Sequence, residues 1–155
     1  EFNHYQEILD EMITTISIYG KSVNSLTGDD VRISERLYIP TNKLRGFQRG
    51  KVGPVDSNDY VGGNYVSSVN IAATLPNIVP NWQNADFSIF LDAGNVWGVD
   101  YSSTINETNT LRSAAGVALD WHTPVGPLSF SYTSVISTAD TDKTEAFRFN
   151  LGTTF

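Results

Sequence analysis

The chain has 155 residues, of which 40% are hydrophobic and 17% charged, with a net charge of -7 and no cysteine. This length and hydrophobic content suffice for one domain with its own core. The apolar residues are spread out and never approach the run of about 20 that a membrane-spanning helix needs. The acidic balance argues against nucleic acid as a partner, and the lack of cysteine excludes a disulfide framework and a thiolate metal site.

The N-terminal residues lack the basic and apolar regions of a secretion signal, so we expect a mature protein or an excised piece of a longer one. Residues 2–9 are short and mixed in character, and we favour a strand there over a helical turn. Residues 12–21 are rich in β-branched and aromatic side chains, which is typical of a strand.

Residues 24–62 contain so many glycine, proline, asparagine and aspartate residues that one regular element is excluded. A loop of this length is usually either functional or disordered. The tetrapeptide Leu44-Arg45-Gly46-Phe47 favours a functional loop, because it places a cation and an aromatic ring beside a glycine that can adopt positive φ.

From residue 64 onward, apolar and polar residues alternate with a period of two, which predicts strands. The expected strands are 64–75, 86–97, 111–122, 127–137 and 145–155, joined by turns and polar loops. In the second of these, Ile89 and Leu91 lie on one face while Ser88 and Asp92 lie on the other. Sequential strands of this kind predict an all-β antiparallel meander.

The polar face of this meander distinguishes two kinds of β-protein. A soluble barrel buries its apolar face, whereas a membrane barrel turns it toward lipid and encloses a polar, wet interior. Here the polar face consists of small residues rather than lysine and glutamate, and the charged content is below the roughly 25% of a typical soluble domain. Trp97, Trp121 and Phe155 lie near strand ends, as interfacial aromatics do. The pattern favours a transmembrane barrel, with a soluble β-barrel binding module as the alternative.

Five segments carry a family resemblance. They are Ile33-Ser34-Glu35-Arg36-Leu37-Tyr38, Leu44-Arg45-Gly46-Phe47, Asp92-Ala93-Gly94-Asn95-Val96-Trp97, Trp121-His122-Thr123-Pro124-Val125-Gly126-Pro127-Leu128 and residues 147–155. In this order they resemble motifs of the BamA-type outer-membrane insertases, a superfamily that also includes TamA and the two-partner secretion translocators, although Thr123 stands where that family usually has serine. The resemblance implies about the last six strands of a sixteen-stranded transmembrane barrel with one long inward-folding loop. The first ten strands and the POTRA domains are not in this sequence, so the chain is expected to be a fragment with open strand edges.

The resemblance also implies which residues form a site. Arg45, at the tip of the loop, is expected to pair with Asp92 in the lumen, because guanidinium and carboxylate match as a bidentate pair. The position of a second family acid is Ala72 here, which leaves Asn70 or Asp120 as candidates for a further contact.

The end of the chain resembles the C-terminal signal of outer-membrane barrels. Its residues in common phase are Phe147, Phe149, Leu151 and Phe155. In the family, the first and last strands form a weak seam, which the terminal strand is therefore expected to border.

The function implied is non-enzymatic assembly and insertion of proteins in the bacterial outer membrane, by strand pairing with a nascent client. The implied partners are the lipid bilayer, nascent outer-membrane proteins and, in the intact protein, accessory assembly lipoproteins. Self-association through the open edges is a further hypothesis. The alternative within the superfamily is a secretion or transport pore.

The residues predict no catalytic, metal or cofactor site. His4 and His122 are far apart in sequence and have no metal-like spacing. Neither a phosphate-binding loop nor a nucleophile elbow occurs. Carboxylates such as Asp140 and Asp142 lie in an expected turn, which they favour.

Overall fold

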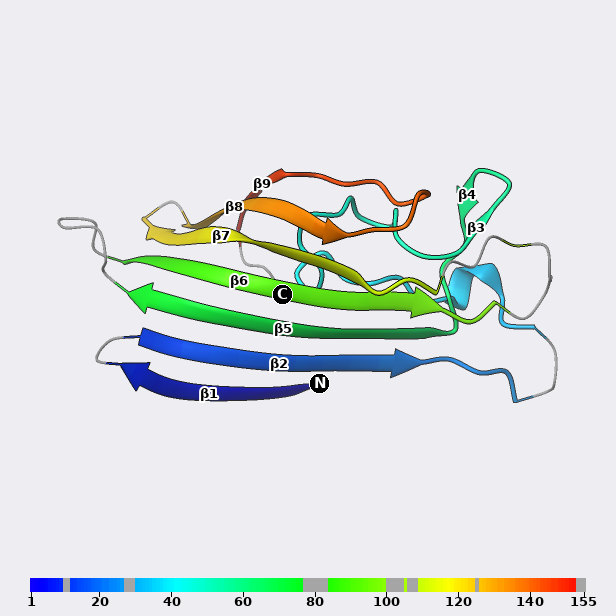
Figure 1. Cartoon of the computed structure of the whole chain (residues 1–155), viewed down its shortest axis with the longest axis horizontal. Helices are drawn as coiled ribbons and strands as arrows, with labels where there is room; N and C mark the ends of the chain where they lie inside the picture. Colours follow the sequence, from blue (N-terminus) through cyan, green and yellow to red (C-terminus); the bar gives the residue numbers. More distant parts are fainter. Residues whose placement is uncertain are drawn as a thin grey trace.

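The chain is described here from a computed structural model, which covers residues 1–9, 12–26, 30–76, 84–99, 105, 109–124 and 126–152. Its main element is a seven-stranded sheet in the order β1-β2-β5-β6-β7-β8-β9 (Figure 1). The strands are β1 (Phe2–Leu9), β2 (Met12–Ser22), β5 (Tyr65–Pro76), β6 (Ala85–Trp97), β7 (Arg112–Thr123), β8 (Gly126–Ser137) and β9 (Phe147–Leu151). Each pairs antiparallel with its neighbours, so the predicted all-β meander is confirmed. No helix among the described residues has the length and apolarity to cross a membrane.

The last strand differs from its expected range of 145–155, since β9 begins at Phe147. The residues just before it form contacts with the long loop: Thr144 forms a bridge with Phe47, and the amide of Glu145 donates to the carbonyl of Gly46 at 2.9 Å. Residues 153–155, including Phe155, lie outside the described part of the chain.

The two faces of the sheet have opposite character. On the outer face the side chains of Ile89, Leu91 and Val117 are 51%, 44% and 39% exposed. On the inner face Ser68 and Asp92 are buried, at 2% and 0% exposed. This is the inverted polarity that the sequence predicts for a membrane barrel.

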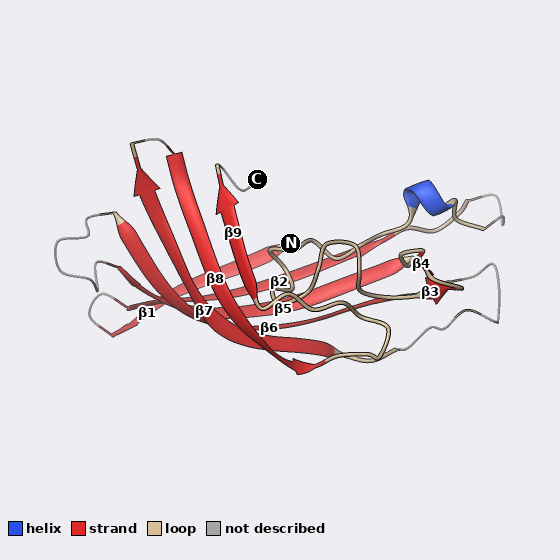
Figure 2. Cartoon of the chain, turned by 90° about the horizontal axis from the view of Figure 1, so that it is seen from above, coloured by secondary structure: helices blue, strands red, loops and turns tan. Residues whose placement is uncertain are grey.

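Burial on the inner face is due to the long loop that joins β2 to β5. The loop runs across this face of the sheet (Figure 2) and contains η1 (Ile33–Glu35), β3 (Val55–Asp56) and β4 (Asp59–Tyr60). Its two arms are joined where the amides of Leu37 and Gly63 each donate to the other's carbonyl, at 2.8 and 2.9 Å. The predicted inward-folding loop is therefore present.

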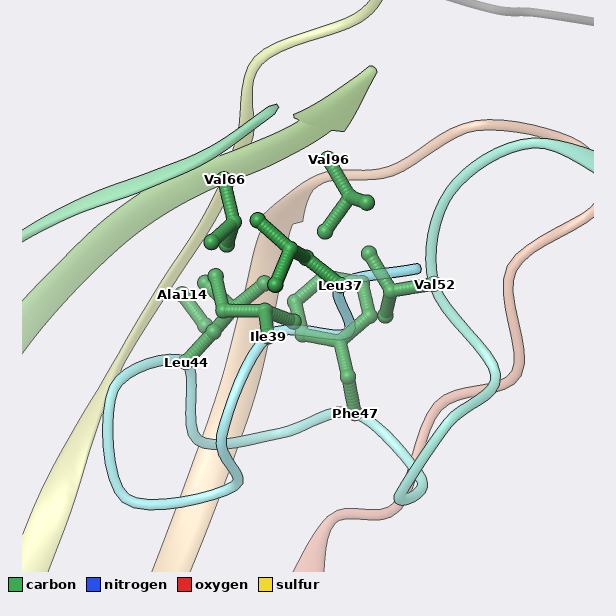
Figure 3. Close-up of a cluster of buried hydrophobic side chains, with 8 residues drawn as sticks. All are labelled: Leu37, Ile39, Leu44, Phe47, Val52, Val66, Val96 and Ala114. Atoms are coloured by element: carbon green, nitrogen blue, oxygen red, sulfur yellow. The ribbon is translucent and has the colours of Figure 1, made fainter. Parts of the chain in front are cut away.

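An apolar cluster lies between the loop and the inner face (Figure 3). Its members are Leu37, Ile39, Leu44, Phe47 and Val52 from the loop, with Val66, Val96 and Ala114 from β5, β6 and β7. At this end of the sheet the loop therefore packs an apolar cluster onto a face whose other buried residues, such as Ser68 and Asp92, are polar. The sequence predicted the polar residues of this face but not the apolar cluster.

Candidate functional site

Residues 41–48, which we call the loop tip, contact the inner face closely. Leu44 and Phe47 belong to the apolar cluster and are each 1% exposed. Between them Gly46 has a φ of +89°, and a Cβ atom there would lie 2.7 Å from Cγ2 of Thr133 on β8. Both the backbone conformation and the space therefore require glycine at this position.

Arg45 and Asp92 are brought together as the family resemblance implies. Nε of Arg45 lies 2.7 Å from Oδ2 of Asp92, and Nη2 lies 2.7 Å from Oδ1. The amide of Arg45 also donates to Oδ2, at 3.0 Å. Two parallel charged hydrogen bonds and one from the backbone fix the direction of the arginine side chain and the path of the loop tip.

Asn70 supplies the further contact to Asp92 for which the sequence left two candidates. It is the cross-strand partner of Asp92 in the β5–β6 register. Its Nδ2 donates to Oδ1 of Asp92 at 2.9 Å and to the carbonyl of Lys43 at 2.8 Å. The other candidate, Asp120, accepts a hydrogen bond from the hydroxyl of Ser129.

An aromatic ring completes the surroundings of Arg45. The guanidinium carbon lies 3.4 Å from the centroid of Phe90, which is the cross-strand partner of Ala72. Gly116 leaves room for this ring, since a Cβ atom there would lie 2.7 Å from Cζ of Phe90. A cation–π contact with Phe90 thus stabilises Arg45.

The site is suited to holding a conformation rather than to a covalent reaction. The side chain of Asp92 is 0% exposed, and burial of a carboxylate is costly unless charged or polar donors surround it. Here it accepts three hydrogen bonds from Arg45 and one from Asn70. Removal of one donor would leave a buried charge partly unpaired. The carboxylate therefore favours the position in which the loop tip contacts the inner face, which we call the seated position of the loop.

A second buried ion pair, which the sequence did not predict, fixes the connection between β8 and β9. Nε of Arg112 lies 2.9 Å from Oδ2 of Asp142, and both side chains are 0% exposed. Oδ2 of Asp142 also accepts the amide of Ala139 at 2.8 Å. The available signal was an arginine at an inward-facing strand position, but its partner lies 30 residues away in an apparent turn.

The β8–β9 connection in turn contacts the loop. The amide of Gln48 donates to the carbonyl of Lys143 at 2.9 Å, and the hydroxyl of Tyr60 donates to the carbonyl of Thr141. Burial, and then the negative charge of Asp142, raise the pKa of Tyr60 above its ordinary value, so the phenol keeps the proton that it donates.

The predicted residues of the terminal strand lie apart from this site. Phe147, Phe149 and Leu151 are exposed on the outer face, and the ring of Phe149 packs against that of Phe130 with centroids 5.0 Å apart. Arg148, which the sequence did not single out, points to the inner face.

Comparisons with known proteins agree with this architecture. The sequence model of the Omp85 superfamily domain matches residues 1–155. The outer membrane protein assembly factor BamA of Neisseria meningitidis serogroup B is 32% identical over 143 residues, covering 72% of this chain and 17% of that protein. BamA of Neorickettsia risticii is 25% identical, covering 92% of this chain and 20% of that protein.

A solved structure shows the same fold. The crystal structure of BamA from Haemophilus ducreyi lacking POTRA domains 1-3 is similar with a TM-score of 0.82 at 28% identity, over 95% of this chain and 32% of that chain. This chain thus spans about a fifth of the length of the curated relatives it matches. The family match over the full sequence, the inverted sheet and the inward loop lead to one assignment: the chain belongs to the Omp85 superfamily.

Proposed function

We propose that this chain is the C-terminal barrel portion of a bacterial outer-membrane factor that assembles and inserts other outer-membrane proteins. The observation that carries the proposal is the loop tip, which the Arg45–Asp92 pair seats on the inner face of a sheet with inverted polarity. The relatives named as outer membrane protein assembly factors support it.

The mechanism requires strand pairing and no covalent chemistry. In the described part of the chain, β1 and β9 each have a single neighbour in the sheet. The free edge of β9 offers main-chain donors and acceptors to a client strand, which satisfies its own groups by joining that edge. The seated loop keeps the inner face closed while the client pairs at the edge.

The proposal extends to the partners. The exposed apolar side chains of the outer face, such as Ile89 and Leu91, contact the lipid bilayer. Nascent outer-membrane proteins pair with the terminal strand. Accessory assembly lipoproteins bind the intact protein, and the isolated chain self-associates through its β1 and β9 edges.

Reconstitution of the full-length protein in lipid vesicles tests this function. The protein is expected to accelerate the folding of an unfolded outer-membrane barrel added from outside, and Arg45→Ala is expected to reduce this acceleration by roughly tenfold, equivalent to about 1.4 kcal/mol. Arg49→Ala is the matched control, because Arg49 is an exposed arginine of the same loop. Ion flux across the vesicles without any acceleration of client folding would instead indicate a pore.

A further inference from the structure

Arg148 of β9 lies beneath the loop tip on the inner face. It is the cross-strand partner of Ser131 on β8, and its side chain is 15% exposed. Nη2 donates to the carbonyl of Phe47 at 2.7 Å, and Nη1 donates to the carbonyl of Thr41 at 3.2 Å. One guanidinium therefore holds the backbone of the loop tip at two points, before the tetrapeptide 44–47 and at its last residue.

Glu145 orients this guanidinium. Its Oε2 accepts from Nε of Arg148 at 3.0 Å and from Nη2 at 2.6 Å. The amide of Glu145 donates to the carbonyl of Gly46 at 2.9 Å. The pair thus forms a small unit at the start of β9 that contacts the loop tip through three backbone carbonyls.

The loop tip is consequently held by two strands that are not neighbours. Asp92 on β6 binds it through Arg45, and Arg148 on β9 binds it through Thr41 and Phe47. Two strands, β7 and β8, lie between β6 and β9 in the sheet. The loop tip therefore bridges the interior of the sheet to the edge strand.

We propose that Arg148 is a positioning residue that couples the seating of the loop to the pairing of β9 with β8. Movement of β9 away from β8 carries the Arg148 side chain away from the carbonyls that it binds, and loss of the seated loop removes those carbonyls from Arg148. Energetic coupling between two sites is reciprocal, so each change promotes the other. The coupling is a property of this chain and requires no client.

Arginine suits this role better than lysine. The planar guanidinium presents donors in several fixed directions, which here reach two carbonyls and one carboxylate. The ammonium group of a lysine at the same place would have the charge but not the planar, fixed arrangement of N–H donors. Lysine is therefore expected to restore the contact with Glu145 and to hold only part of the loop tip.

Hydrogen–deuterium exchange of the full-length protein in lipid vesicles, without client, tests the coupling. Arg148→Gln is expected to accelerate exchange at least about fivefold in residues 41–48, while the amides between β5 and β6 keep their rates. Asp92→Asn is expected to accelerate exchange between β8 and β9 in the same way, although Asp92 does not touch β9. Arg148→Lys should lie between the wild type and Arg148→Gln, and Arg49→Gln, with the same loss of charge, should match the wild type.

Two results would overturn the proposal. One is unchanged exchange between β8 and β9 in Asp92→Asn, which would mean that the loop tip does not communicate with β9. The other is equal acceleration in every strand of Arg148→Gln, which would mean a general loss of stability. If Arg148→Gln does not assemble, Glu145→Gln provides the test, because it leaves the arginine in place and should accelerate only residues 41–48 and the start of β9.

Discussion

Asp92 depends on its donors because its carboxylate is fully buried. Three of its four hydrogen bonds come from Arg45, so the two residues act as one unit. Because Arg45 compensates the desolvation of Asp92, the pair stabilises the position in which the loop tip contacts the inner face.

A double-mutant cycle measures this pair. Arg45→Ala and Asp92→Ala are each expected to destabilise the full-length protein, with a coupling free energy of about 1–3 kcal/mol from urea unfolding in detergent micelles. The coupling arises because the second substitution removes a group that the first has already left unpaired. Additivity of the two changes within about 0.5 kcal/mol would reject the pairing.

Gly46 allows the loop tip to approach β7 and β8 closely, because it has no Cβ atom. Gly46→Ala introduces a side chain at a φ of +89° and 2.7 Å from Thr133, so the loop is expected to leave its seat and to become sensitive to limited proteolysis. Gly50→Ala is the control, since Gly50 has a φ of +67° but its Cβ would meet only Tyr38, at 4.0 Å. Equal proteolysis of the two variants would show that the close approach at Gly46 has no importance.

At this scale the sequence predicted some contacts and missed others for a definable reason. Arg45 and Asp92 were identified through motifs that the family shares, and Asn70 lies in phase with Asp92 on the neighbouring strand. Arg112 was missed because its partner Asp142 lies 30 residues away, and Arg148 was missed because the carbonyls that it binds belong to the distant long loop. Both occupy inward-facing positions of strands. The alternation of the sequence identifies such positions, so a charged residue at one of them could have been predicted to have a partner on the inner face.

At the scale of elements, the loop owes its order to the surface it covers. It has little regular structure of its own, but Leu44 and Phe47 bury their side chains against β5, β6 and β7. The sequence indicated the loop and its tip, but it did not predict the apolar cluster in which the loop packs against the inner face. Val66 and Val96 share the inward phase of the polar residues Ser68 and Asn70, and these two apolar exceptions mark where the loop packs.

Phe47 is expected to dominate this packing. Phe47→Ala should lower the free energy of unfolding by about 3–5 kcal/mol, because it removes a buried ring and leaves a cavity in the apolar cluster. Ile33→Ala, at a loop position that is 60% exposed, should change it by no more than about 0.5 kcal/mol. Similar unfolding midpoints for the two variants in urea would show that the loop does not pack on the sheet as described.

At the scale of the molecule, the period-2 pattern correctly predicted the order of the strands and the orientation of their faces. It did so because side chains alternate strictly between the two sides of a strand, whichever solvent each side meets. How the edges of β1 and β9 are satisfied could not be read from the pattern, since pairing at an edge depends on segments or partners other than the sheet itself.

The orientation of the sheet toward lipid is the claim on which the rest depends, and spin labels on β6 test it most directly. This chain has no cysteine, so one cysteine introduced at position 88, 89 or 91, in a full-length protein without other cysteines, carries a single nitroxide in bilayers. Labels at Ile89 and Leu91 are expected to collide with oxygen dissolved in the lipid, and the label at Ser88 to be shielded from both oxygen and a water-soluble nickel complex. Collision of the nickel complex with the labels at Ile89 and Leu91 would contradict the account.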